Sequence, residues 1–211
     1  MKASFDRLIG GKLLLFLVTL GIGYVDVLSN VSGHSVLTPY SAGSLEGVTP
    51  SFGAWGTTFY LIGVALGVPL ARVLSGRFGE YRVLTYGYLC YAITSLICVS
   101  SVSVFMYAPT RFVFGVFGGF LAVVSQSAAL GELPERQYKI GLGYWAALGI
   151  LPYTLAVFLG GFWAEYFSWR WLFYANATLG FVISAIIGAL FLVANSSARS
   201  CVSTSWAMCC S

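Results

Sequence analysis

The chain has 211 residues, of which 58% are hydrophobic and only 9% are charged, and its mean hydropathy is +0.85. Soluble globular proteins carry about 25% charged residues, so these charges are too few to solvate a globule of this size, and lipid is the expected solvent for much of the chain. This excludes a soluble enzyme and a nucleic-acid-binding protein. A membrane-spanning helix needs about 20 apolar residues, which leaves room for about six or seven helices.

The gaps between charged residues predict six membrane-spanning helices. The first span follows Lys12 and contains one charge, Asp26. Uncharged runs then cover residues 47–71, 83–110, 112–131, 140–164 and 171–198. Each run can cross a hydrocarbon core of about 30 Å at about 1.5 Å per residue. We therefore expect an all-α membrane protein, a six-transmembrane-helix bundle with helices over residues 12–33, 53–75, 83–103, 107–130, 140–163 and 170–194.

Short polar segments connect these helices. Residues 43–52 are rich in turn-forming residues and predict an external loop, residues 76–82 form a charged turn, and Pro134 interrupts the segment 131–138. The third and fourth helices are joined by the small polar stretch 100–103. Two spans joined without a charge indicate a hairpin at the outer face.

The positions of Lys and Arg predict that both termini are cytoplasmic. With six spans, all of the 11 basic residues except Arg111 and Arg170 lie on the side of the termini, and cytoplasmic loops carry the excess of Lys and Arg. The expected organisation in the cell membrane is a cytoplasmic amino terminus (1–11), a six-helix transmembrane bundle (12–194) and an irregular cytoplasmic tail (195–211). A cleaved signal peptide is the competing interpretation of the first span, but the apolar run continues without an A-x-A-like cleavage site.

Asp26 is the most informative residue, because it falls about halfway along the first span. An ionised carboxylate there costs at least about 2.5 kcal/mol, so the group must face a water-filled cavity, find a cation or remain protonated. Each option makes Asp26 a candidate proton carrier. The structural alternative is an aspartate that is hydrogen-bonded to helix backbones or to Asn30, four residues on.

Arg111 is the second unusual charge, since it opens the fourth span just after Pro109. It either snorkels to the interface or, if its helix packs beside the first, pairs with Asp26 inside the membrane. The neutral polar residues Asn30, Ser125 and Gln126 either line a substrate path or hold helices together by hydrogen bonds.

Several kinds of chemistry find no support in the sequence. The five cysteines and the single histidine, His34, have no metal-ligand spacing, so we expect no metal and no cofactor. There is no G-x-S-x-G motif, no histidine pair and no paired carboxylates within one span, which argues against an intramembrane enzyme. No filter-like loop or ring of like charges indicates a channel.

Several motifs resemble those of the major facilitator superfamily. Residues 76–82 resemble its loop signature G-x-x-x-D-R-x-G-R-[KR], with Arg77 and Gly79 in matching positions and Arg82 one residue past the final basic position. Arg111 with Gly115 resembles the fourth-helix signature R-x-x-Q-G. Resemblance to the drug/proton antiporter branch with 14 spans, the EmrB/QacA type, extends to Trp55, Thr58, Ala65, Pro69 and residues 125–127 and 169–173.

The chain also departs from these signatures. Gly76 stands at the loop aspartate, and Glu80 and Tyr81 stand at the two basic positions of the loop. Phe114 replaces the glutamine of the fourth-helix motif. Of the fifth-helix antiporter motif G-x-x-x-G-P-x-x-G-G, only Gly160 and Gly161 remain.

The resemblance implies the amino-terminal half of a proton-coupled efflux transporter for drugs or other small hydrophobic or cationic molecules. It implies proton coupling at Asp26 and Arg111, helix packing at Gly115, Gly160 and Gly161, and no enzymatic activity. The implied substrate path includes Asn30, Trp55, Thr58, Ser125 and Gln126.

Transporters of this superfamily use two six-helix bundles, and this sequence supplies one. We expect a reading frame that is truncated or frame-shifted near residue 196, or a half-size protein that pairs with a second copy or another subunit. The alternative function is a non-transporting fragment or membrane interaction subunit, in which the same polar residues only assist packing.

Overall fold

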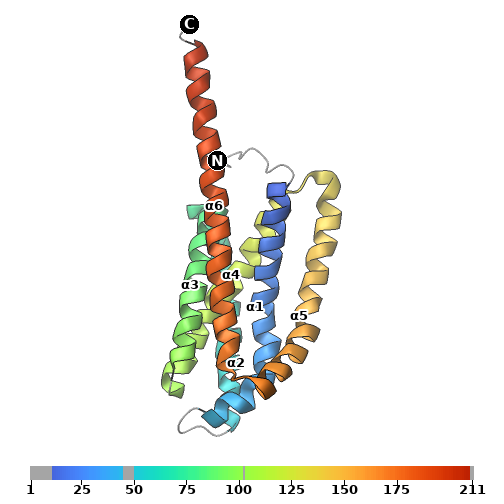
Figure 1. Cartoon of the computed structure of the whole chain (residues 1–211), viewed down its shortest axis with the longest axis vertical. Helices are drawn as coiled ribbons and strands as arrows, with labels where there is room; N and C mark the ends of the chain where they lie inside the picture. Colours follow the sequence, from blue (N-terminus) through green and yellow to red (C-terminus); the bar gives the residue numbers. More distant parts are fainter. Residues whose placement is uncertain (1–10, 45–49, 102, 210–211) are drawn as a thin grey trace.

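The computed structural model describes residues 11–44, 50–101 and 103–209 of the chain, and these form a bundle of long helices (Figure 1). The elements are α1 (Gly11–Ser44), α2 (Pro50–Phe78), α3 (Glu80–Ser100), α4 (Val104–Glu132), the 3₁₀ turn η1 (Glu135–Gln137), α5 (Tyr138–Tyr166) and α6 (Arg170–Cys209). Six helices in the described part of the chain are long and apolar enough to cross a membrane. The predicted all-α fold with six spans is therefore confirmed.

Two helices continue far beyond their predicted ends. α1 runs to Ser44 rather than residue 33, and α6 runs to Cys209 rather than residue 194. The segment expected to be an irregular tail is thus helical up to Cys209, because no glycine or proline follows Gly188 to end the helix. The apolar parts of α1 and α6 end earlier than the helices, at Leu37 and Leu192. The gaps between charged residues therefore predict the apolar spans, and the helices continue past them. Of the predicted external loop 43–52, residues 43–44 and 50–52 are helical, and residues 45–49 lie outside the described residues.

The predicted charged turn between the second and third helices shrinks to one residue, Gly79. α2 ends at Phe78 and α3 begins at Glu80. Gly79 has a φ of +83°, the only positive value among the described residues. Side chains with a Cβ rarely adopt this conformation, so glycine at this position permits the sharp reversal.

Glycines bring α2 and α4 into backbone contact. A Cβ added to Gly63 or Gly67 of α2 would overlap the backbone of α4, and one added to Gly115 or Gly119 of α4 would overlap the backbone of α2. Small residues at a spacing of four allow this close approach between membrane helices. α2 with α4, α3 with α6 and α1 with α5 form the most extensive helix pairs.

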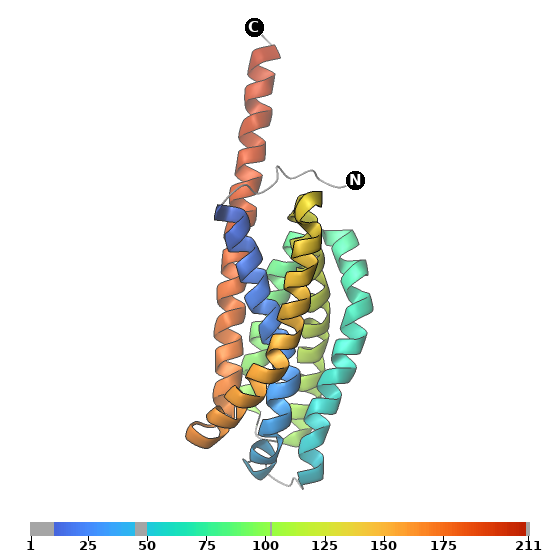
Figure 2. The ribbon, with the colours of Figure 1, turned by 90° about the vertical axis from the view of Figure 1, so that its right-hand side faces the viewer.

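α1 lies between α5 and α6 on one side of the bundle (Figure 1). α5 and α6 approach each other at the end where the chain passes from one to the other, and they diverge along α1 towards its amino terminus. The view turned by 90° shows α5 and α6 apart near the amino terminus of α1, and α5 crossing α1 towards its other end (Figure 2). A flank of α1 is therefore covered by neither helix.

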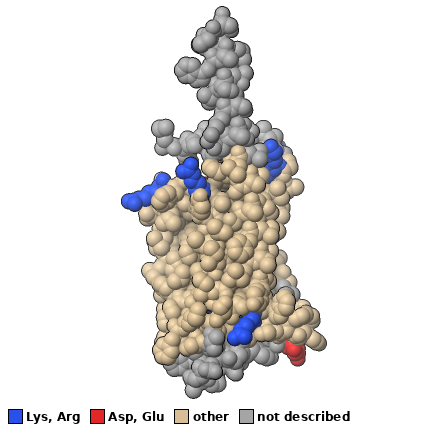
Figure 3. All heavy atoms as spheres, turned by 60° about the vertical axis from the view of Figure 1, so that its left-hand side comes forward, with Lys and Arg blue, Asp and Glu red and all other residues tan. Residues whose placement is uncertain are grey.

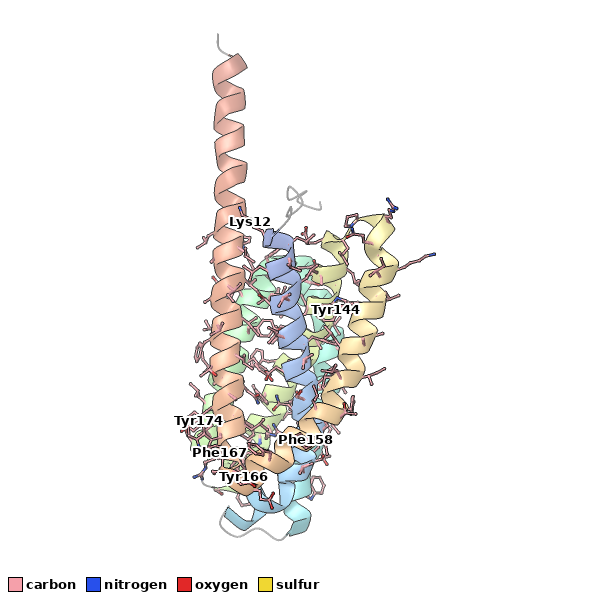
Figure 4. All side chains as sticks on the ribbon, turned by 45° about the vertical axis from the view of Figure 1, so that its right-hand side comes forward. Lys12, Tyr144, Phe158, Tyr166, Phe167 and Tyr174 are labelled. Carbon is pink, nitrogen blue, oxygen red and sulfur yellow. The ribbon has the colours of Figure 1, made fainter. Side chains whose placement is uncertain are left out.

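The surface agrees with a membrane location. On the face shown in Figure 3, charged side chains lie towards the two ends of the described body and leave a wide band of other residues between them. In Figure 4, Lys12 lies at the upper end of α1, and Tyr166 and Phe167 lie at the opposite end, where α5 leads into α6. Tyr166 is 69% exposed and Trp171 is 52% exposed, as expected of aromatic side chains at a membrane interface.

Candidate functional site

A network of buried polar side chains lies at the middle of α1. Asp26 and Asn30 are one turn apart and face α3 and α6, where they meet Tyr91 and Asn176. Asn30 Nδ2 donates to the backbone oxygen of Asp26 and to the Tyr91 hydroxyl, both at 3.0 Å. The Tyr91 hydroxyl then donates to Asp26 Oδ2 at 3.1 Å. The chain of donors therefore ends on the carboxyl group of Asp26.

The Asn176 amide brings α6 into this network. With its nitrogen towards Asp26, it donates to Asp26 Oδ1 at 2.8 Å and to the backbone oxygen of Leu172 at 3.3 Å, and its oxygen faces Asn30. This is the orientation that gives both atoms of the amide suitable partners. The carboxyl group of Asp26 therefore accepts hydrogen bonds from both α3 and α6.

Arg111 is fully buried inside a cage of aromatic rings. Its guanidinium carbon lies 4.8 Å from the ring centre of Tyr60 and 5.3 Å from that of Phe173, with Phe114 and Tyr107 at 5.8 and 6.0 Å. Ring faces attract a cation, which offsets part of the cost of burial. In the described part of the chain, none of its three guanidinium nitrogens has a hydrogen-bond partner.

The expected contact between Asp26 and Arg111 is therefore not made in this structure. Aromatic rings lie between the two groups: Tyr91, which donates to Asp26, stacks on Phe114 at 4.4 Å between ring centres. The Tyr60 ring lies under Arg111, and its hydroxyl donates to the backbone oxygen of Val27 at 2.9 Å. A shared layer of rings thus joins the two charges, although their side chains do not touch.

Replacement of Arg111 by methionine is expected to raise thermal stability while reducing any function that needs the charge. Exchange of buried charged groups for apolar residues of similar volume is often neutral or stabilising by about 1–4 kcal/mol. The melting temperature in detergent measures this effect. Arg111→Lys is the control, because it keeps the charge but loses the flat face that stacks on the rings, and it is expected to be less stable than the methionine variant. The reverse order of stability would contradict the unpaired state of Arg111.

The remaining predicted path residues are not all in one place. Ser125 is buried and shares a hydrogen bond of 3.0 Å with the Tyr88 hydroxyl. Its neighbour Gln126 instead lines a separate hollow of about 420 Å³ beside the start of α5. Trp55 is 50% exposed near the start of α2, and Thr58 is also exposed. The structure thus gathers Asp26 and Asn30 with Tyr91 and Asn176, places Ser125 beside them through Tyr88, which packs against Tyr91, and places Gln126, Trp55 and Thr58 elsewhere.

The loop motif is tied to α4 by two carboxylates. Glu80 accepts from Ser127 Oγ at 2.6 Å, and the Tyr81 hydroxyl donates to Glu132 Oε1 at 2.7 Å. Arg82 packs over the ring of Phe191 in α6 at 5.8 Å, while Arg77 lies exposed in the last turn of α2. The residues that depart from the family signature, Glu80 and Tyr81, therefore connect α3 to α4 within this bundle.

Tyr81→Phe is expected to destabilise the bundle by about 1–2 kcal/mol, because it leaves the Glu132 carboxylate without its donor. The free energy of unfolding in detergent measures the loss. Tyr86→Phe is a matched control on the same helix, since Tyr86 is 66% exposed and should lose almost nothing. Equal stability of the two variants would show that the bond to Glu132 has no net effect.

The three glycines expected to pack helices differ in their surroundings. Gly115 lies against the backbone of Tyr60, and Gly160 lies near Gly33, where an added Cβ would be 3.1 Å from the backbone oxygen. Nothing lies within 4 Å of a Cβ added at Gly161. Packing therefore requires glycine at Gly115, constrains Gly160 and leaves Gly161 free of close neighbours among the described residues.

Comparison with known proteins places these features in context. The profile of the Major Facilitator Superfamily matches residues 15–206. The chain is 29% identical over 175 residues to the multidrug export protein EmrB of Escherichia coli K12, which covers 82% of this chain and 34% of that protein. It is 30% identical over 173 residues to the fatty acid resistance protein FarB of Neisseria gonorrhoeae, with 81% and 34% covered. The chain thus spans about a third of the length of these relatives.

Proposed function

Since this chain belongs to the major facilitator superfamily, we propose that its bundle is the proton-coupling part of a secondary active transporter that exports small hydrophobic or cationic molecules, including drugs. The observation that carries the proposal is the carboxyl group of Asp26, which is buried midway along a membrane-length helix and is hydrogen-bonded to two neutral side chains, Tyr91 and Asn176. A proton carrier needs both states to be accessible in the same site. The names of two relatives, a multidrug export protein and a fatty acid resistance protein, agree with a small hydrophobic substrate.

Arg111 has a supporting role in this proposal. The guanidinium group lies in the ring layer that also contacts Asp26 through Tyr91. The rings that contact Arg111 therefore also form part of the surroundings of Asp26. Movement of this layer would change how readily Asp26 releases its proton.

The proposed transport unit contains a second six-helix bundle, in the same polypeptide, in a second copy or in another subunit. Alternating access in this superfamily moves one bundle against another around a site near the membrane midplane. The bundle is proposed to lie in the cell membrane with its basic end, which includes Lys12, Arg77 and Lys139, in the cytoplasm. The greater length of the relatives supports this arrangement.

Proton flux in inside-out membrane vesicles from cells that express the chain tests the proposal. With the vesicle interior acidified, addition of a lipophilic cationic dye is expected to release protons from the interior, because substrate enters in exchange. Vesicles from cells without the chain provide the baseline. Flux that is equal in the two preparations would contradict transport by this chain, alone or with a partner present in these cells, and would favour a non-transporting interaction subunit.

A further inference from the structure

Two buried polar side chains, Arg111 of α4 and Thr57 of α2, carry donor groups without acceptors. Arg111 is 0% exposed, and none of its guanidinium nitrogens is hydrogen-bonded. The hydroxyl oxygen of Thr57 is buried in the same way. Of the five buried side-chain nitrogen and oxygen atoms without a partner in the described part of the chain, four belong to these two residues. Buried polar groups are almost always hydrogen-bonded, so this concentration indicates a bound water molecule or ion.

The register of α2 and α4 places both side chains at one level of the bundle. The two helices lie side by side (Figure 2) and run in the same direction, as their glycine contacts show. Gly115 of α4 lies against the backbone of Tyr60 of α2. Arg111 lies one turn before Gly115 on the same face of α4, and Thr57 lies one turn before Tyr60 on the same face of α2. The Arg111 guanidinium carbon is 4.8 Å from the Tyr60 ring centre, so this side chain is directed towards α2.

The surroundings of Arg111 supply no negative charge. In the described structure its guanidinium group has no hydrogen bond to a carboxylate, and the carboxyl group of Asp26 is bonded to Tyr91 and Asn176 instead. The groups that enclose it are aromatic rings, those of Tyr60, Tyr107, Phe114 and Phe173. Ring faces attract a cation, but more weakly than an anion does when water is excluded. Burial of this charge is therefore only partly compensated.

A small monovalent anion supplies what both side chains lack. The guanidinium group offers only donors, and the threonine hydroxyl adds one more. Water would accept from these donors but would leave the positive charge unpaired. A monovalent anion accepts from them and also cancels the charge, so no net charge remains buried. A divalent anion such as sulfate would leave a negative charge among the aromatic rings, which favours an ion such as chloride.

We propose that Arg111 and Thr57 bind one chloride ion at the contact between α2 and α4. Arg111 lies seven residues after Val104, the first residue of α4, which is about 10 Å along the helix axis. The ion therefore enters from the water at the end of the bundle where α4 begins. The bound ion neutralises Arg111 and links α4 to α2. The site goes beyond the proposed transport function, because anion binding requires neither Asp26 nor a second bundle.

Equilibrium binding of radioactive chloride to the full chain in detergent tests this site, with sodium gluconate used to keep the ionic strength constant. The unmodified protein is expected to bind one chloride per chain. Unlabelled nitrate is expected to displace the ion, and sulfate is not. At about ten times the dissociation constant, chloride is expected to raise the melting temperature by about 3–6 °C relative to gluconate, because it binds only the folded protein.

Two variants and a matched control locate the ion. Arg111→Met is expected to abolish chloride binding, so its gain in stability over the unmodified protein should be largest in gluconate. Thr57→Val keeps the volume and removes the hydroxyl group, and it should weaken binding by about tenfold, as expected for loss of a hydrogen bond to a charged group. Thr110→Val is the control for it. The Thr110 hydroxyl directly precedes Arg111 but is bonded to the backbone oxygen of Met106 at 2.7 Å, so this variant should bind chloride like the unmodified protein.

The other outcomes overturn the site. Folded, unmodified protein that binds no chloride would show that the buried donors are left to water. Binding that persists in both Arg111→Met and Thr57→Val would indicate an adventitious ion only, and equal weakening in Thr57→Val and Thr110→Val would remove Thr57 from the site. If Arg111→Met does not fold, the comparison of the two threonine variants decides. Because binding is measured without substrate or a proton gradient, its failure leaves the proposed transport function unaffected.

Discussion

Asp26→Asn is expected to abolish substrate-dependent proton flux while the protein remains folded in the membrane. Asparagine has nearly the same shape as aspartate and its amide oxygen still accepts the hydrogen bond from Tyr91, but it cannot release or take up a proton. The variant therefore removes titration and keeps most of the packing. The measurement is proton flux in inside-out vesicles, with the amount of folded protein in the membrane determined in parallel.

Two controls separate loss of the proton carrier from loss of structure. Asp26→Glu keeps a titratable group and should retain part of the flux, whereas Ser29→Ala removes a hydroxyl group three residues along the same helix and should retain nearly all of it. Full flux in the Asp26→Asn vesicles would refute the assignment of Asp26 as proton carrier. Loss of proton flux in the Ser29→Ala vesicles as well would show that transport is sensitive to any substitution in this part of α1, and not specifically to loss of the carboxyl group.

Gly115→Val is expected to prevent stable folding of the bundle. The added side chain would overlap the backbone of Tyr60, and backbone atoms cannot move aside as a flexible side chain can. α2 and α4 would have to separate along the line of contact that also includes Gly63, Gly67 and Gly119. Overpacking of a well-packed core costs about 1–3 kcal/mol or more, and the backbone contact places this site at or above the upper end of that range.

Gly161→Val is the matched control for this substitution. The sequence motif marks both glycines as packing positions, yet a Cβ at Gly161 meets nothing within 4 Å. We expect the Gly115 variant to be lost from the folded fraction after detergent extraction, and the Gly161 variant to be extracted like the unmodified protein. Similar yields for both variants would contradict the close contact between α2 and α4.

The membrane-spanning helices could be predicted from the sequence, because the charge and hydropathy of each residue do not depend on how the helices pack. An isolated charge such as Asp26 is expensive in lipid wherever the helix packs, so both the spans and this unusual residue are visible in the sequence. The true helix ends at Ser44 and Cys209 were not visible, because a helix can continue past the membrane until glycine, proline or a cap ends it.

The partners of the buried charges could not be predicted, because they depend on how each helix is rotated. Arg111 and Asp26 are the two isolated charges within spans, which suggests a pair, yet the rotation of α4 turns Arg111 into a ring of aromatic side chains. Tyr91 was missed because a tyrosine inside a span looks like an ordinary apolar residue. Asn176 carried a usable signal, since it is a neutral polar residue within the sixth uncharged run.

The one-residue connection at Gly79 sets the rotational phase of α3 relative to α2. A residue inserted in this non-helical connection would remove that constraint and let α3 shift and turn about its axis, which would carry Tyr88 and Tyr91 away from α1. Glu80 and Tyr81 oppose such a turn, because both are bonded to α4. Changes in the length of this connection would therefore alter the environment of Asp26 from a distance of three helical turns along α3, without any substitution near the carboxyl group.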